Sequence, residues 1–219
     1  MLTALVAVVA GLLGLVVGHL VNRAAARLPR SEPVSDRRYA LRPPVVELAT
    51  ALLFALAALR FGLAWDLPAF LVLAAAGVLL AVIDLQHHLL PNRVVVPSLG
   101  IGAALLFVAA LPEADWGSLL RAGLGAVVLF AVYLVLALIS PRGLGMGDVK
   151  LAGLIGLYLG WIGWNAVLAG AVAGFVIQAL LALVLLAGRR IGLRGELPFG
   201  PAMLFGAAVA IGWSGALLG

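Results

Sequence analysis

Two aspartates in this 219-residue sequence differ from most of its other acidic residues, because each lies at the edge of a long apolar run. Asp84 follows the run 71–83, and Asp148 leads into the run that begins at Leu151. Two carboxylates held within a few ångströms of each other do not both ionise readily, so one stays protonated while the other is charged. The charged carboxylate can take a proton from water, and the protonated one can donate to a carbonyl oxygen. This pair therefore suits peptide hydrolysis without a metal or a nucleophilic side chain.

The residues around Asp148 suit a loop that carries a catalytic carboxylate. Gly143, Gly145 and Gly147 precede it, and glycine allows close backbone approach and positive φ. Lys150 follows it and could pair with a carboxylate of the site. We favour a simpler interpretation of Lys150, in which it belongs to the basic residues that remain on the cytoplasmic side of a membrane.

Helix capping is the competing explanation for the two aspartates. A carboxylate at a helix start, the place expected for Asp148, stabilises the helix. A carboxylate at a helix end, the place expected for Asp84, is unfavourable. Capping therefore explains Asp148 but does not explain Asp84.

Metal chemistry is the weaker alternative for this site. His87 and His88 are adjacent and cannot share one helix face. Together with His19 and Asp84 they could form a metal site, but no His-Glu-x-x-His spacing is present. We expect His87 and His88 to lie in an interfacial loop, and we expect neither a metal nor a cofactor.

The composition indicates a protein with many membrane spans. Hydrophobic residues make up 65% of the chain and charged residues only 11%, against about 25% charged in soluble domains. The predicted fold is an all-α membrane bundle of about eight helices with no soluble domain, since a span needs about 20 apolar residues. The spans are predicted at 2–21, 45–63, 67–83, 94–111, 118–139, 148–162, 164–187 and 199–218. The sixth is short, and whether it is separate from the seventh stays open.

Basic residues give these spans a topology. Twelve of the 14 lysines and arginines lie in alternate loops, at 22–44, 84–93, 140–150 and 188–198. Because positive loops stay inside, we expect both termini outside and both aspartates at the cytoplasmic face. The other two, Arg60 and Arg121, lie near span ends, where long side chains can reach the interface. The net charge of +5 is thus explained without nucleic-acid binding. The first span has no basic residue before it, so we expect it to be retained rather than cleaved as a signal peptide.

Five segments resemble the type IV prepilin peptidases, which are intramembrane aspartyl peptidases of the Gly-x-Gly-Asp class. They occur in the order found in that family and span nearly the whole chain. The segments are 18–29 with Asn22 and Arg27-Leu28-Pro29, 42–48 with Glu47, 84–92 with Asp84 and Pro91-Asn92, 145–150 with Asp148, and 197–201 with Pro198-Phe199-Gly200-Pro201.

The resemblance implies an endopeptidase of a prokaryotic cytoplasmic membrane. Such enzymes remove the short basic leader of prepilins or pseudopilins, whose apolar helix lies in the lipid bilayer. Asp84 and Asp148 would be the catalytic residues, and Gly145, Gly147 and Pro91 would shape the site. Gln86 stands where an acidic residue is common, and Asn92 where an aspartate is frequent.

One departure from the family concerns methylation. Many members carry a cytoplasmic insertion with two Cys-x-x-Cys pairs, linked to N-methylation of the new amino terminus. Here only the short loop 22–44 is present, and the chain has no cysteine. We therefore expect a peptidase-only form, with residues 1–44 as a reduced N-terminal region and 45–219 as the peptidase-like membrane domain.

Two other functions compete with the peptidase. A proton-coupled transporter could use Asp84 and Asp148 as relay groups, but relay carboxylates are expected near span midpoints rather than span ends. A non-enzymatic platform of a secretion machine is the third option. The sequence identifies neither the pilin cleaved, nor the oligomeric state, nor which aspartate acts as acid.

Overall fold

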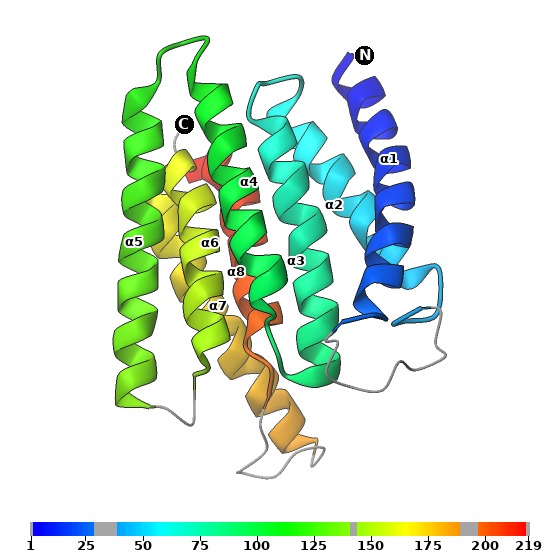
Figure 1. Ribbon diagram of the computed structural model, residues 1–219, viewed down its shortest axis with the longest axis vertical. Helices are drawn as coiled ribbons and strands as arrows, with labels where there is room; N and C mark the ends of the chain where they lie inside the picture. Colours follow the sequence, from blue (N-terminus) through cyan, green and yellow to red (C-terminus); the bar gives the residue numbers. More distant parts are fainter. Residues whose placement is uncertain (1, 29–38, 141–143, 189–196, 218–219) are drawn as a thin grey trace. The chain divides into compact units, whose positions relative to one another are not determined.

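The described part of the chain is built from α-helices alone. Figure 1 shows the computed structural model, which describes residues 2–28, 39–140, 144–188 and 197–217. The helices are α1 (Leu2–Ala25), α2 (Val45–Phe61), α3 (Leu67–His87), α4 (Asn92–Ala110), α5 (Trp116–Ile139), α6 (Met146–Ile162), α7 (Trp164–Ala187) and α8 (Gly200–Leu217). The prediction of an all-α membrane bundle is confirmed, and the helices follow the predicted spans one for one.

Two of the predicted span ends were wrong. Helices α1 and α3 each continue about one turn beyond the ends predicted at residues 21 and 83. Most of the residues in these extra turns are polar or charged, which a helix tolerates where it leaves the apolar layer. The separation left open between the sixth and seventh spans is real, because Gly163 is extended (φ 160°, ψ 163°) and divides α6 from α7.

Helix lengths suit a membrane. Within the described residues, α1, α3, α4, α5 and α7 are long and apolar enough to cross a bilayer. Helices α2 and α6 have 17 residues each, which is near the lower limit of about 17–25 for a span. In α8 the segment Gly200–Ser214 is a shorter apolar helix.

The chain divides into two compact units, Met1–Asp115 and Trp116–Gly219. In the first unit α1 packs closely on α2. A Cβ added to Gly14 would lie 2.6 Å from the Ala51 Cα, and one added to Gly18 would lie 2.7 Å from the Glu47 Cα. The small residues therefore allow this approach, as is usual between membrane helices.

In the second unit α6 is the buried helix. Every residue from Leu151 to Gly160 is buried, and α6 contacts α5, α7 and α8. A Cβ added to Gly125 of α5 would lie 2.5 Å from the Gly156 carbonyl oxygen of α6. The Asp148-bearing helix is thus fixed along its length by backbone-to-backbone packing.

Arg121 has a partner that the sequence did not suggest. Its side chain contacts the end of α6. Arg121 Nε donates to the Gly160 carbonyl at 2.8 Å and Nη2 donates to the Trp161 carbonyl at 2.7 Å. The last carbonyls of a helix have no partner within the helix and attract a cation, so the arginine caps α6.

Parts of the basic loops used in the topology argument lie outside the described residues, at 29–38, 141–143 and 189–196. The second of these ranges includes Gly143, one of the glycines predicted to shape the loop before Asp148.

Candidate active site

Asp84 is a buried carboxylate in the last turn of α3. It is 5% exposed. The two residues before it, Val82 and Ile83, pack in a cluster with Val21 of α1 and Val46 of α2. These contacts fix the turn that carries the carboxylate. The carboxylate lies at the negative end of the helix dipole, so it does not serve as a helix cap.

A tight turn follows Asp84. His88 adopts the left-handed conformation (φ 52°, ψ 40°), and its N–H donates to the Asp84 carbonyl at 2.8 Å. Pro91 is the N-cap of α4, and its carbonyl accepts the Val94 N–H at 2.9 Å. Residues 88–91 therefore join α3 to α4 in a short connection whose ends are both fixed.

Asp148 lies in the first turn of α6 and caps it. Its Oδ2 accepts the Gly145 N–H at 3.0 Å, while its own N–H donates to the Gly145 carbonyl at 3.1 Å. Gly145, the N-cap, is exposed, and Gly147 and Asp148 are half-buried. The capping interpretation was therefore right for Asp148, and its charged form is stabilised by the helix N-terminus.

Other side chains of the second unit gather around the start of α6. Lys150 is half-buried on its first turn. The buried phenol of Tyr133 from α5 lies within electrostatic range of Asp148. The Tyr133 ring lies 5.4 Å from that of Phe175 and 6.1 Å from that of Phe199. The Pro-Phe-Gly-Pro segment thus contributes to an aromatic cluster near Asp148, which the sequence alone did not suggest.

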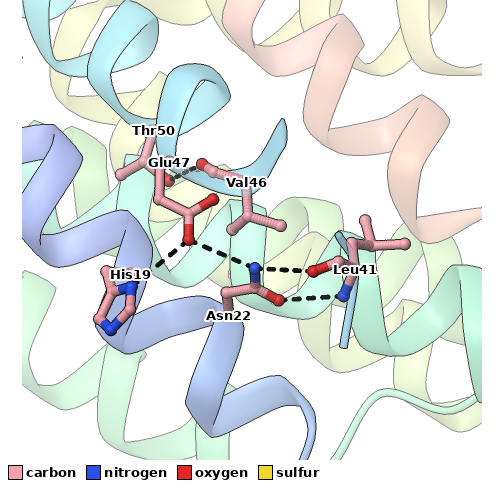
Figure 2. A network of polar contacts seen from close by, with 6 residues as sticks. All are labelled: His19, Asn22, Leu41, Val46, Glu47 and Thr50. Carbon is pink, nitrogen blue, oxygen red and sulfur yellow. Dashed lines mark hydrogen bonds and ion pairs between the residues drawn. The ribbon is translucent and has the colours of Figure 1, made fainter. Parts of the chain in front are cut away.

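A polar network lies between α1 and α2 (Figure 2). Asn22 is fully buried, and its side-chain amide makes two hydrogen bonds of 3.0 Å with the backbone of Leu41. Its Nδ2 also donates to Glu47 Oε1 at 3.4 Å. His19 Nδ1 lies 3.6 Å from the same oxygen. In the sequence, Asn22 and Glu47 belong to two segments that resemble the family, and a contact between them was not expected.

His19 is therefore beside Glu47 rather than in a group with His87 and His88. Among the described residues no group of three or more histidine, aspartate or glutamate side chains could hold a metal ion. His87 ends α3 and His88 follows it as its C-cap, so only His88 lies in the connection predicted for both.

The predicted site residues belong to both units. Asp84 and Pro91 lie in the first unit, at the α3–α4 connection. Gly145, Asp148 and Lys150, with Gly147, lie in the second unit, at the start of α6. Each aspartate thus occupies a terminal turn of its helix, one at a C-terminus and the other at an N-terminus.

The fold and these helix ends define a polytopic helical membrane protein with carboxylates near its helix termini. The sequence pattern of the type IV leader peptidase family matches residues 71–212. The chain belongs to this family. The matched range includes both Asp84 and Asp148.

Curated relatives support the family. The chain is similar to proteins named prepilin leader peptidase/N-methyltransferase from three bacteria. The one from Stutzerimonas stutzeri is 33% identical over 177 residues, covering 78% of this chain and 58% of that protein. For Pseudomonas aeruginosa the values are 31%, 173 residues, 78% and 58%, and for Bacillus subtilis 34%, 167 residues, 76% and 64%. The chain therefore spans about three fifths of their length. No solved structure matches it.

Proposed function

We propose that this protein is a membrane-embedded aspartyl endopeptidase that removes the leader peptide from type IV prepilins or pseudopilins. The observation that carries the proposal is the position of the two aspartates. Both fall within the range matched by the leader peptidase family, and each occupies a terminal turn of its helix. A relay carboxylate of a proton-coupled transporter would be expected nearer the middle of its span, so these positions favour the peptidase.

The environments of the two carboxylates favour different roles. The helix N-terminus and the Gly145 N–H stabilise the charged form of Asp148. Burial and the C-terminus of α3 oppose a charge on Asp84, which is 5% exposed. Carboxylates whose environments differ in this way divide acid and base roles between them. We therefore assign Asp148 as the general base and Asp84 as the general acid.

The proposed reaction needs only these two groups and water. Asp148 takes a proton from the water as its oxygen attacks the scissile carbonyl carbon, and Asp84 donates its proton to the carbonyl oxygen. The tetrahedral intermediate then collapses. Its C–N bond breaks as the leaving amine takes a proton from the carboxyl group of Asp148. One hydroxyl of the intermediate returns its proton to the Asp84 carboxylate and becomes the C=O of the new carboxyl group. No cofactor takes part.

The charge pattern supports a cytoplasmic site. Basic residues lie in alternate loops, so both termini are assigned outside and both aspartates inside. The substrate helix would lie in the bilayer with its scissile bond at the cytoplasmic end. We assign this activity to residues 45–219 and treat residues 1–44 as a reduced N-terminal region. Because the chain has no cysteine, we propose that it does not methylate the product.

Leader cleavage in liposomes tests the function. The purified chain would be mixed with a substrate that has a short basic leader, a glycine and a long apolar helix. The proposal predicts a single cut at the end of the leader, located by mass spectrometry. Proton flux into the same liposomes, measured with a pH-sensitive dye, provides the contrast. Flux without cleavage would favour the transporter and overturn the proposal.

A further inference from the structure

We propose that Asn22 and Glu47 form a clamp that positions Asp84 for the reaction, acting through residues 40–41 and Gln86. The proposal rests on the proposed function, because it gives Asp84 a role that needs exact placement. Asn22 and Glu47 are positioning residues here.

The clamp begins at the end of α1. The Asn22 amide pairs with the Leu41 backbone as two strand residues would pair, donating from Nδ2 to the carbonyl and accepting the N–H at Oδ1, both at 3.0 Å. The Asn22 carbonyl also accepts the Ala40 N–H at 3.3 Å. A fully buried amide needs both of its donors and its acceptor satisfied. All of these groups are satisfied here, and residues 40–41 are fixed as a result.

Glu47 reinforces the orientation that the Leu41 backbone gives this amide. A carboxylate can only accept, so the Asn22 Nδ2 must face Glu47 Oε1, 3.4 Å away (Figure 2). Glu47 is 7% exposed, and its Oε2 has no hydrogen-bond partner among the described residues. Burying such an oxygen costs stability. Packing of α1 on α2 does not require this buried carboxylate, whereas Glu47 Oε1 satisfies the second donor of the Asn22 amide.

The clamp reaches α3 through Gln86. Gln86 Nε2 donates to the Ala40 carbonyl at 2.8 Å. Gln86 lies two residues after Asp84 in the last turn of α3, where most carbonyls lack helical partners and fraying begins. The preceding turn is held by apolar packing of Val82 and Ile83. The hydrogen bond to Ala40 therefore ties the turn that carries Asp84 to residues 40–41.

Kinetics of leader cleavage test this role. Asn22→Ala should lower kcat by about 10- to 100-fold, because a displacement of about 1 Å can have this effect, and should leave KM nearly unchanged. Thr50→Val is the matched control: Thr50 is buried in the same α1–α2 interface but bonds only locally, to the Val46 carbonyl at 2.8 Å. Equal kcat losses in the two variants would overturn the proposal.

Variants of exposed Gln86 keep the test valid if Asn22→Ala fails to fold. Gln86→Glu is nearly isosteric but has no donor for the Ala40 carbonyl, so kcat should fall. Gln86→Lys restores a donor, so kcat should return towards the wild-type value. Equal kcat for these two variants would contradict the clamp.

A thiol reporter separates the clamp from the peptidase claim. The chain has no cysteine, so Asp84→Cys carries the only thiol. Removing one hydrogen bond by Gln86→Glu should speed its modification by a maleimide by roughly two- to tenfold, whereas Gln86→Lys and Thr50→Val should not. Unchanged modification rates would overturn the clamp even if Asp84 proves essential. Faster modification together with full activity of Asp84→Asn would leave the clamp intact and refute the proposed function.

Discussion

The Gly145 N–H donates a 3.0 Å hydrogen bond to Asp148 Oδ2, so the residue that forms the N-cap of α6 also holds the carboxylate. This contact joins helix capping to the proposed chemistry. The two explanations were alternatives for Asp148 in the sequence, and the structure makes them compatible. A cap that stabilises the charged form is what a general base requires at the pH of cleavage.

Removing this amide should move one limb of the pH profile. Gly145→Pro deletes the N–H, and the φ of −81° at Gly145 suits proline. Loss of the donor destabilises the charged carboxylate, so a higher pH is needed to ionise it. The midpoint of the acidic limb of the kcat/KM profile should then move to a pH about 0.5–1 unit higher. Gly145→Ala keeps the N–H and should leave this midpoint unchanged. If the alkaline limb rises instead, Asp148 is the acid and our role assignment is reversed.

Arg121 should stabilise α6 through its two carbonyl contacts. Arg121→Met keeps an apolar stem but leaves the Gly160 and Trp161 carbonyls without this donor. We expect a loss of about 1–3 kcal/mol in the free energy of unfolding, measured by thermal unfolding in detergent. Arg60→Met is the control, because Arg60 is exposed at the end of α2. A similar loss for Arg60→Met would show that Arg121 acts only as an interfacial charge.

Glycine packing between α5 and α6 gives a third prediction. Gly125→Ala would bring a Cβ to 2.5 Å from the Gly156 carbonyl oxygen, whereas nothing lies within 4 Å of a Cβ at Gly123 on the same helix. Gly125→Ala should therefore lower stability by about 1–3 kcal/mol through overpacking. Gly123→Ala should be neutral or slightly stabilising, because alanine favours helix. Equal unfolding temperatures for the two variants would show that α5 and α6 are not held at this distance.

The absence of cysteine leads to a prediction about the product. The mature amino terminus made by this protein should carry no added methyl group. The measurement is the mass of the mature substrate after co-expression with the wild-type chain, with the uncleaved substrate as reference. A gain of one methyl that depends on this protein would show that N-methylation does not need the cysteine-containing insertion.

The helices could be predicted from the sequence because each is an apolar run. Their ends were harder to place. The residues Asn22, Arg23, Asp84, Gln86 and His87 are polar. They remain helical because each adds backbone hydrogen bonds where the helix leaves the apolar layer. Hydropathy detects the apolar layer and not the helix, so both helices were predicted too short.

The site could be predicted only in part. The position of Asp148 at the start of a helix could be predicted from the apolar run that follows it. The Asn22–Glu47 contact could not be predicted, because it joins residues 25 apart and depends on the close approach at Gly18. Arg121 likewise contacts the carbonyls of Gly160 and Trp161, which lie 39 and 40 residues later in the chain. No local pattern distinguishes such cases, since the deciding partner lies on another helix.

The central claim is that Asp84 and Asp148 act as one catalytic pair. Its most direct test is single-turnover leader cleavage by wild type, Asp84→Asn and Asp148→Asn in the same liposomes, with folding checked by thermal unfolding. Each substitution keeps the side-chain shape and removes one carboxylate. We expect either variant to lose about 100- to 10,000-fold in rate, and the double variant to be no slower than the worse single one, as for groups that act as a unit. Near wild-type cleavage by either well-folded single variant would contradict the claim.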